Sequence, residues 1–207
     1  MNSSEQGKKG EILSAALDMF SVNGYSAVSI RDIGKAVGIK ESSIYYHFKD
    51  KKDILETMLE QAEQLAMVRK ESFYDALYAV SRIECGKFIL AGIAYVEGYL
   101  LEDRIFRLIR MLTIEKQRNE NAAAIYHKLL FTAPLEHHKE VFSFMKDKGY
   151  IKADDPDLLA AEYQSIILYV FQKYFSGPGA ATDDAKSAAR RELTALLKRF
   201  FVRYICR

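Results

Sequence analysis

The stretch SIRDIGKAVGIKESSIYYHF, residues 29–48, decides the fold. Apolar residues recur at helical spacing in its first half, and Ser29 stands where an N-cap accepts hydrogen bonds from the first free amides. Gly38 follows at the point where a helix ends through a positive φ. Ile44 and Phe48 then lie four apart, on one face of a second short helix. Two helices joined by such a turn form the helix-turn-helix plan, whose second helix lies in the major groove.

Groups suited to a phosphate backbone follow the turn. They are Tyr45, Tyr46, His47, Lys49, Lys51 and Lys52. Hydroxyls, an imidazole, ammonium groups and helix N-terminal amides all bind phosphate oxygens. Glu41 allows two interpretations, because it either accepts from a cytosine amino group or faces solvent and repels phosphate. The alternative for the whole stretch is an αα-hairpin with packed tyrosines. The coincidence of Gly34, the turn, the YYHF sequence and a trailing lysine at one spacing disfavours it.

This arrangement resembles the TetR family of bacterial transcriptional regulators, whose DNA-binding half has a pattern close to T-x-x-x-I-A-x-x-A-G-V-S-x-x-x-[LI]-Y-x-[HY]-F-x-x-K-x-x-L. Here it stands as S-IRD-I-G-KA-V-G-I-K-ESS-I-Y-Y-H-F-KD-K-KD-I, from Ser29 to Ile54. Gly34 stands where the family usually has alanine, and Lys40 where a serine usually caps the recognition helix. Lysine cannot accept a hydrogen bond, so either Ser42 or water serves the free amides.

The resemblance implies double-stranded operator DNA as a partner. The residues that it and the local chemistry assign to DNA are Ser29, Arg31, Lys40, Glu41, Ser42, Ser43, Tyr45, Tyr46, His47 and Lys51.

Composition favours a helical protein. Of 207 residues, 49% are hydrophobic and three are proline, and the formal net charge of +2 gives no broad basic surface. Cys85 and Cys206 lie far apart in the sequence, which suggests a reducing compartment without a disulfide framework. No run approaches the ~18 apolar residues of a membrane-spanning helix. We therefore expect a cytoplasmic location and no membrane contact.

The expected architecture is all-α, with a three-helix helix-turn-helix domain over residues 7–67 and a larger helical domain over 68–207. A helix over 9–22 precedes the helix-turn-helix, and a long helix from Lys51 connects to the core until its apolar stripe blurs at 69–72. The last two helices, 156–175 and 183–204, carry apolar residues on more than one side, Leu197 and Phe201 among them. That excess predicts a homodimer interface, which is also the place of the four-helix interface in the TetR family.

Two other interpretations of the chemistry are a metal site and an enzyme. Glu136, His137, His138 and Glu140 offer pairs of metal ligands on one helix face, but a solvated face is favoured because no third matching ligand follows. We expect no metal and no cofactor. The nucleophile, phosphate-loop, zinc-protease and dinucleotide motifs are missing from the sequence, so nothing in it indicates an enzyme.

The middle of the chain is rich in aromatic residues. In the resembled family this region holds a pocket for a small, often hydrophobic effector, and a tyrosine in an apolar cavity supplies both area and a hydroxyl. The candidates are Tyr95, Tyr99, Phe106, Arg110, Met111, Tyr126, Phe131 and Tyr163. For any one of them, plain core packing is the alternative. Arg110 must pair with Glu97, Glu115, Glu162 or an anionic ligand.

The sequence thus predicts a homodimeric repressor that releases its operator when a small hydrophobic or aromatic molecule binds. One alternative is a TetR-like regulator controlled by a protein partner, without a ligand pocket. A less favoured alternative is a helical enzyme whose N-terminal motif is incidental.

Overall fold

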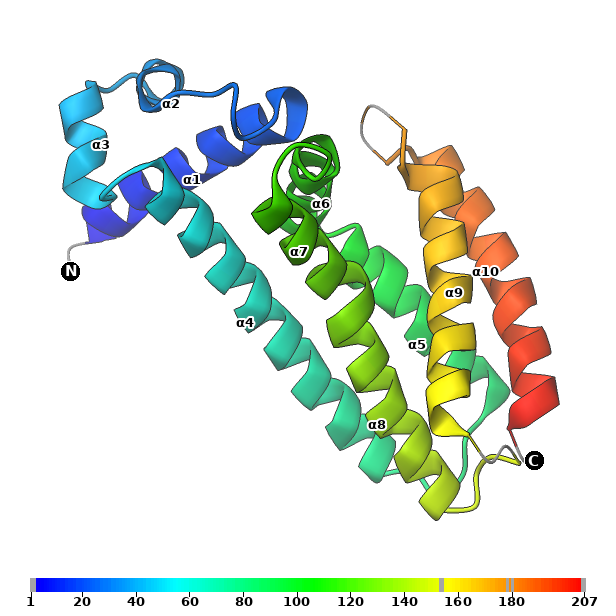
Figure 1. The fold of residues 1–207 in the computed structure, drawn as a ribbon. Coiled ribbons are helices and arrows are strands. Elements are labelled where there is room, and N and C mark those ends of the chain that lie inside the picture. Colours follow the sequence, from blue (N-terminus) through cyan, green and yellow to red (C-terminus); the bar gives the residue numbers. More distant parts are fainter. Residues whose placement is uncertain (1–2, 153–154, 178, 180, 206–207) are drawn as a thin grey trace. The chain divides into compact units, whose positions relative to one another are not determined.

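The computed structural model describes residues 3–152, 155–177, 179 and 181–205. Its elements in chain order are α1 (Ser3–Asn23), α2 (Ile30–Val37), α3 (Glu41–His47), α4 (Lys51–Tyr78), α5 (Cys85–Tyr95), the π-helix η1 (Val96–Leu100), α6 (Asp103–Glu115), α7 (Glu120–His127), the π-helix η2 (Lys128–Thr132), α8 (Ala133–Asp147), α9 (Pro156–Phe175) and α10 (Asp183–Tyr204) (Figure 1). Within the described ranges the sole β pairing is an isolated bridge between Ile151 and Ile205. The all-α prediction is confirmed. None of the helices described is long and apolar enough to cross a membrane.

Two compact units divide the chain. The first holds the residues up to Arg69 together with Asp103–Tyr126, and the second holds Lys70–Glu102 and the residues from His127 onward. The division falls inside α4, close to where the apolar stripe blurs. The compact units differ from the predicted domains, 7–67 and 68–207, in that α6 and most of α7 belong with the N-terminal helices.

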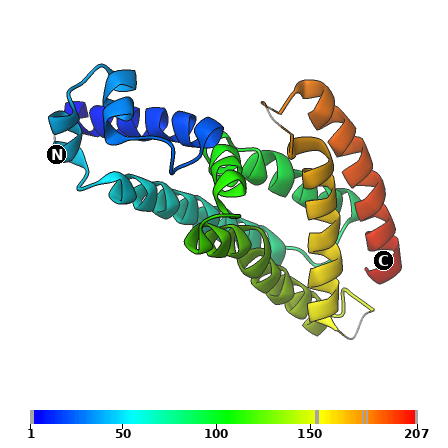
Figure 2. The same cartoon turned by 45° about the horizontal axis from the view of Figure 1, so that its top comes forward.

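Helix α1 forms the centre of the first unit. It packs against α2 and α6 (Figures 1 and 2), and its residues Ile12, Ala16 and Phe20 are completely buried. Arg107 on α6 pairs with Asp18 on α1 and with Asp103 one turn earlier on its own helix. The apolar face that the sequence shows in its first helix therefore covers both the helix-turn-helix and α6.

The second unit is built from α5, α8, α9 and α10. Helix α9 packs between α8 and α10, and α10 also packs on α5 (Figure 2). Phe88 and Phe200 stack with ring centroids 5.8 Å apart. A Cβ added at Gly92 would lie 2.4 Å from Cδ1 of Leu197, so the close approach of α5 to α10 requires glycine there.

Two stretches differ from the sequence expectation, and a third contains a π-helix. Helix α4 continues through 69–72, because Lys70 and Tyr74 both bind Glu140 on α8, at 2.8 and 2.5 Å. The first helix begins at Ser3 rather than near residue 9. Pro134 lies in the first turn of α8, where its missing N–H costs no hydrogen bond, and the segment before it is the π-helix η2.

Candidate DNA interface and aromatic cluster

The first helix of the helix-turn-helix begins and ends as its sequence predicts. The Ser29 side chain accepts from the amide of Asp32, and the Asp32 carboxylate accepts from the amide of Ser29 at 3.0 Å, which together form a capping box. The Ser29 hydroxyl also donates to the Asp32 carboxylate, and this bond, together with the one from the Ser29 amide, lowers the pKa of Asp32. Gly38 ends the helix with a φ of 71°. Both cap predictions are confirmed. Since the Ser29 hydroxyl is used in the cap, its first role is to fix the start of α2.

The turn between α2 and α3 is tight. The amide of Ile39 donates to the carbonyl of Gly34 at 2.9 Å, and a Cβ added at Gly34 would lie 3.0 Å from the backbone oxygen of Ile39. An alanine, the usual residue of the family, would need a shift of a few tenths of an ångström. Gly34 therefore suits a close crossing of the two helices.

Recognition helix α3 begins at Glu41. Lys40 takes the N-cap position and no side chain of the described residues caps the helix, so Ser42 lies inside α3 and does not serve as its cap. The structure describes α3 in full, and Ile44 is its one buried residue. The exposed residues around it are Lys40, Glu41, Ser42, Ser43, Tyr45 and Tyr46. Tyr45 and Tyr46 are 51% and 75% exposed.

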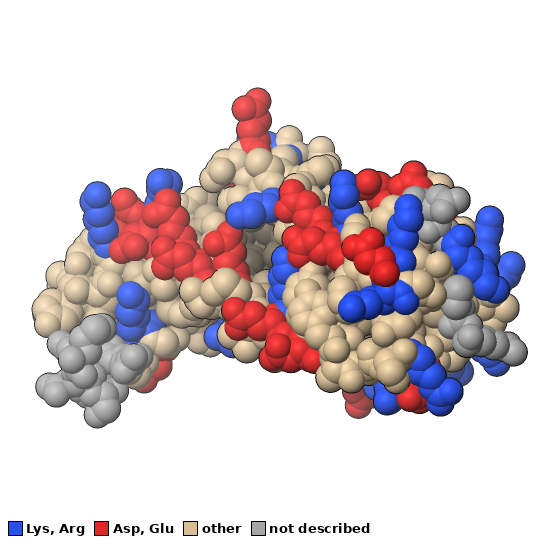
Figure 3. Space-filling view, turned by 90° about the horizontal axis from the view of Figure 1, so that it is seen from below, with Lys and Arg blue, Asp and Glu red and all other residues tan. Residues whose placement is uncertain are grey.

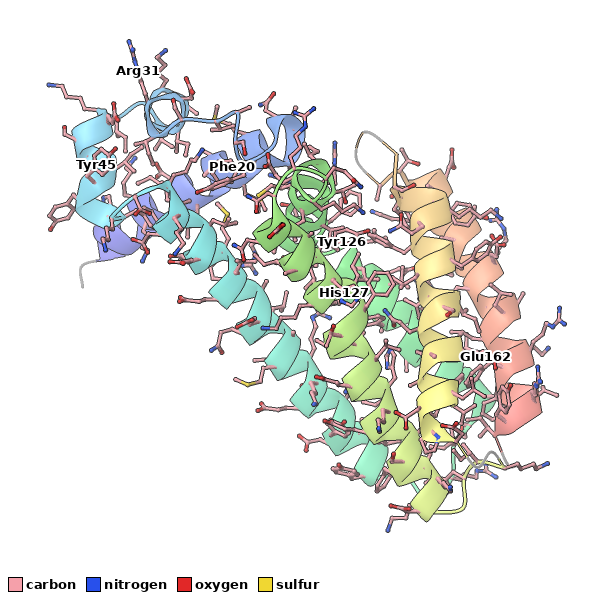
Figure 4. The ribbon with its side chains drawn as sticks, in the orientation of Figure 1. Phe20, Arg31, Tyr45, Tyr126, His127 and Glu162 are labelled. Atoms are coloured by element: carbon pink, nitrogen blue, oxygen red, sulfur yellow. The ribbon has the colours of Figure 1, made fainter. Side chains whose placement is uncertain are left out.

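The other predicted DNA contacts lie at the margins of this surface. Arg31 is exposed on α2 and projects away from the ribbon (Figure 4). His47 is half-buried, with its ring edge-on to that of Tyr46 at 5.2 Å. On the face shown in Figure 3, basic and acidic side chains are interspersed, in keeping with the formal net charge of +2. That small net charge favours local DNA contacts over a broad basic face.

Lys51 has a structural role that the sequence did not reveal. Its ammonium donates to the carbonyls of Tyr25 at 2.9 Å and Val28 at 2.8 Å, and it lies 4.3 Å from the centre of the Tyr25 ring. Burial lowers the pKa of Lys51. Because two of its three N–H donors hold the α1–α2 turn, at most one remains for the phosphate contact predicted from the sequence.

Glu115 holds the same turn from the side of α6. Its carboxylate accepts from the amide of Ser26 at 3.0 Å and from the Ser26 hydroxyl at 2.7 Å, and the residue is 7% exposed. Gly24 has a φ of 84°, and a Cβ there would lie 2.5 Å from Glu115 Oε1. Sequence reasoning considered Glu115 only as a partner for Arg110. The signal that could have found it is an acid at the end of a strongly apolar helix.

The predicted effector residues separate into two groups. Tyr95, Tyr99 and Tyr163 lie in the second unit, where the rings of Tyr95 and Tyr99 stack at 5.7 Å. Phe131 also belongs to this unit and stacks on His127 at 5.2 Å. The residues that fall in the first unit are Phe106, Arg110, Met111 and Tyr126.

Arg110 is half-buried on α6. The three carboxylates considered for it each receive other hydrogen bonds. Glu97 accepts from Arg190, Glu115 from Ser26, and Glu162 from Tyr204 at 2.6 Å. The predicted role of Arg110 toward an anionic ligand stays a prediction.

Two polar residues that the sequence did not assign to the effector region lie beside the tyrosines. His138 and Gln164 are 7% and 2% exposed, and Nε2 of His138 lies 3.0 Å from Oε1 of Gln164. The amide nitrogen of Gln164 donates to the carbonyl of Leu130 at 2.8 Å. The His138 ring meets those of Tyr95 and Tyr163 edge-on, at 5.7 and 4.8 Å. The solvated face predicted for the histidine pair is therefore wrong for His138, because the packing of α8 on α9 encloses it.

The electrostatics of this cluster follow from its burial. Burial lowers the pKa of His138 to about 3, so the imidazole is neutral near pH 7. Burial raises the pKa of Tyr95 and of Tyr163, so both hydroxyls stay protonated. The hydroxyl of Tyr95 is fully enclosed and has no hydrogen-bond partner among the described residues. A neutral site with an unused donor results.

The two helices expected at a dimer interface, α9 and α10, have some apolar residues buried within the protomer and others exposed. Leu197 and Phe201, predicted there, are buried within the protomer at 0% and 5% exposure. Leu158, Tyr169 and Val202 are instead 65%, 50% and 60% exposed on α9 and α10. Cys85 is a half-buried free thiol, and Cys206 lies outside the described residues.

The chain is similar to known proteins in both sequence and fold. A family model for bacterial regulatory proteins of the tetR family matches residues 12–58, from α1 to the start of α4. The biofilm operon icaADBC HTH-type negative transcriptional regulator IcaR of Staphylococcus aureus is 28% identical over 204 residues, which cover 93% of this chain and 98% of IcaR.

Solved structures share the fold along almost the whole chain. A regulator from Mesorhizobium loti assigned to the TetR family has a TM-score of 0.70 at 21% identity and covers 99% of this chain and 100% of its own. The SmeT–triclosan complex has a TM-score of 0.67 at 18% identity and covers 97% of this chain and 92% of its own. The helix-turn-helix geometry, the matched N-terminal sequence and the shared fold agree, and over residues 12–58 the chain is similar to the bacterial regulatory proteins of the tetR family.

Proposed function

We propose that this DNA-binding transcriptional regulator is a homodimeric repressor that leaves its operator when a small molecule binds in the second unit. IcaR is named as a negative regulator, and SmeT was solved with triclosan, which supports both parts of the proposal. The repressor acts in the cytoplasm, where bacterial DNA lies. Its relatives are regulators, and the proposal contains no catalytic step.

The exposure of α3 is the observation that carries the DNA-binding role. A seven-residue helix that buries Ile44 alone, and that the structure describes in full, contributes little to the core. Its exposed face nevertheless presents hydroxyls, a carboxylate and two tyrosine rings at fixed positions, held by the capped α2 and the tight turn. A rigid, polar, convex helix of this kind fits the major groove.

The roles of the side chains follow from their places on this surface. Lys40, Glu41, Ser42 and Ser43 lie at the N-terminal end of α3, the part of a recognition helix that contacts base edges. The residues proposed to contact phosphate are Arg31, Tyr45, Tyr46 and His47. Lys51 adds one donor at most, and Ser29 holds the start of α2.

Release of the operator requires two states. A dimer reads two half-sites about 34–36 Å apart, so a small change in the separation of the two recognition helices spoils the fit. An effector that binds the DNA-incompetent state more tightly lowers operator affinity, and the operator lowers effector affinity by the same factor. The residues proposed to meet the effector are those of the second unit, Tyr95, Tyr99, Phe131 and Tyr163.

Selection of an operator from a random duplex pool by the purified protein, followed by fluorescence anisotropy, tests the DNA-binding part. Tyr46→Phe removes one phosphate donor and should weaken binding about fivefold on every sequence. Tyr78→Phe is the matched control, because Tyr78 is 58% exposed and lies in the second unit. Ser43→Ala should instead change the preference at one base position. Failure to enrich any sequence, or equal effects of the two tyrosine variants, would refute the proposed docking.

A further inference from the structure

The hydroxyl of Tyr95 is a buried donor without an acceptor. It is fully enclosed and has no hydrogen-bond partner among the described residues, whereas the residue as a whole is half-buried. Buried hydroxyls in folded proteins are almost always paired, so an orphan of this kind needs an explanation. One explanation is an acceptor that is absent from the chain itself.

The polar groups nearest to Tyr95 are already engaged with each other. The carbonyl of Leu130 accepts from the Gln164 amide nitrogen, which turns the amide oxygen of Gln164 toward His138. Gln164 influences the pKa of Tyr95 but does not accept from its hydroxyl in hydrogen-bonding geometry. The chain therefore arranges an amide, an imidazole and a phenol around one place and leaves one donor of the three unused.

Two π-helical segments border the same cluster. Helix η1 begins at the residue after Tyr95, and η2 contains Leu130, the acceptor for Gln164. A π-helix is rare, because its wide turn packs less well than an α-helix, and such segments occur frequently at functional sites. One of the two segments directly follows Tyr95 and the other supplies the acceptor for Gln164, which is an observation independent of the orphan hydroxyl.

The cluster carries no charge of its own. Its polar members are tyrosines, a neutral histidine and a glutamine. Glu97 and Glu162, on the elements that build it, are bound to Arg190 and Tyr204. Glu140, on α8, is bound to Lys70 and Tyr74. A charged ligand group would lose its hydration here without a counter-charge, which is strongly unfavourable.

We propose that Tyr95 is the hydrogen-bond donor of the effector site, and that the effector is an uncharged aromatic molecule with a carbonyl, ether or phenolic oxygen as acceptor. This inference rests on the proposed function, in which a small molecule releases the operator. The aromatic preference follows from the rings of the cluster. Those of Tyr99 and His138 pack on the Tyr95 ring, and that of Tyr163 packs on His138, so the cluster offers faces and edges to a flat ligand. Tyr95 thus orients the ligand in this site.

Matched pairs of probes test the acceptor. Benzophenone and diphenylmethane differ by one carbonyl oxygen, as do acetophenone and ethylbenzene, and 4-benzoylbenzoate adds a negative charge to benzophenone. Calorimetry or thermal shift on the full-length protein should show that at least one ketone binds about tenfold more tightly than its hydrocarbon, and that the benzoate binds more weakly. Equal binding within both pairs, no ketone binding up to the solubility limit, or tighter binding of the benzoate overturns the proposal.

Substitution of the tyrosine identifies the donor. Tyr95→Phe should remove the ketone preference and leave hydrocarbon binding unchanged, and without ligand the variant should melt no lower than the unmodified protein, because an unpaired hydroxyl has been removed. Tyr163→Phe is the matched variant from the same cluster and should keep the preference. A preference that survives Tyr95→Phe, or that is lost only in Tyr163→Phe, overturns the assignment.

Operator release is measured separately by anisotropy with benzophenone and acetophenone. Ligand binding that depends on Tyr95 but does not release the operator would support the site and contradict the proposed regulation. Release that persists in Tyr95→Phe would uphold the regulation and overturn the site. The two proposals therefore fail in distinguishable ways.

Discussion

Replacement of Glu115 by glutamine should destabilise the α1–α2 turn, which directly precedes the helix-turn-helix. The carboxylate makes two hydrogen bonds with Ser26, at 3.0 and 2.7 Å, from a residue that is 7% exposed. Hydrogen bonds to a charged group each contribute about 1.5–3 kcal/mol. Because Ser26 is exposed, water replaces part of the lost interaction. Each bond therefore lies near the low end of that range, and the two bonds together contribute about 3 kcal/mol. Glutamine keeps one acceptor oxygen, so Glu115→Gln should cost about half of this.

The assay is urea unfolding at one protein concentration, with Glu60→Gln as the control. Glu60 is an exposed residue of α4, and its substitution makes the same change in net charge. A double-mutant cycle with Ser26→Ala isolates the pair, for which we expect a coupling energy of about 1 kcal/mol or more. Operator affinity should also fall in Glu115→Gln and not in Glu60→Gln. Equal midpoints for the two glutamine variants, or a coupling energy near zero, would refute the role of Glu115.

Three further predictions concern other parts of the chain. Lys51→Met should lower the free energy of unfolding by about 1–2 kcal/mol and leave the salt dependence of operator binding unchanged; a slope reduced by about one would instead show a phosphate contact. Val202→Asp should yield a monomer in sedimentation, whereas Val68→Asp, at similar exposure, should not; a dimer in both would exclude the face of α10 as the interface. The unfolded chain binds a proton at His138 below pH 6.5, whereas the folded chain binds it only near pH 3. Lowering the pH from 7 to 5 should therefore reduce the free energy of unfolding by about 2 kcal/mol through this residue. Denaturant melts of His138→Gln should lack that part of the loss.

The helix-turn-helix was predictable because its signals are local. Ser29 and Gly38 fix the two ends of α2 through bonds to residues within four positions, and the chemistry of α3 lies on one short exposed helix. The start of α3 was not predictable, because Lys40 offers no acceptor. The structure settles it at Glu41.

The interactions that the sequence did not reveal join residues far apart along the chain. Glu115 binds Ser26 across 89 positions, and His138 binds Gln164 across 26. A periodic pattern marks each of these helices as apolar, but it does not say which distant element meets its polar residues. The π-helices are hidden for another reason, because a search for a period of 3.6 passes over a turn of different width.

The first unit is discontinuous in sequence, and this constrains the order in which the protein becomes structured during synthesis. The surface of α1 that α6 covers cannot be buried until the ribosome has passed Asp103–Tyr126. After residue 69 emerges, that delay amounts to about 3–11 s at bacterial elongation rates. A fragment cut at residue 69 would keep α2 and α3 but would expose this apolar face and lack the carboxylate of Glu115 at the α1–α2 turn. The smallest soluble DNA-binding fragment therefore needs α6 as well, supplied either by the intervening chain or by a designed linker.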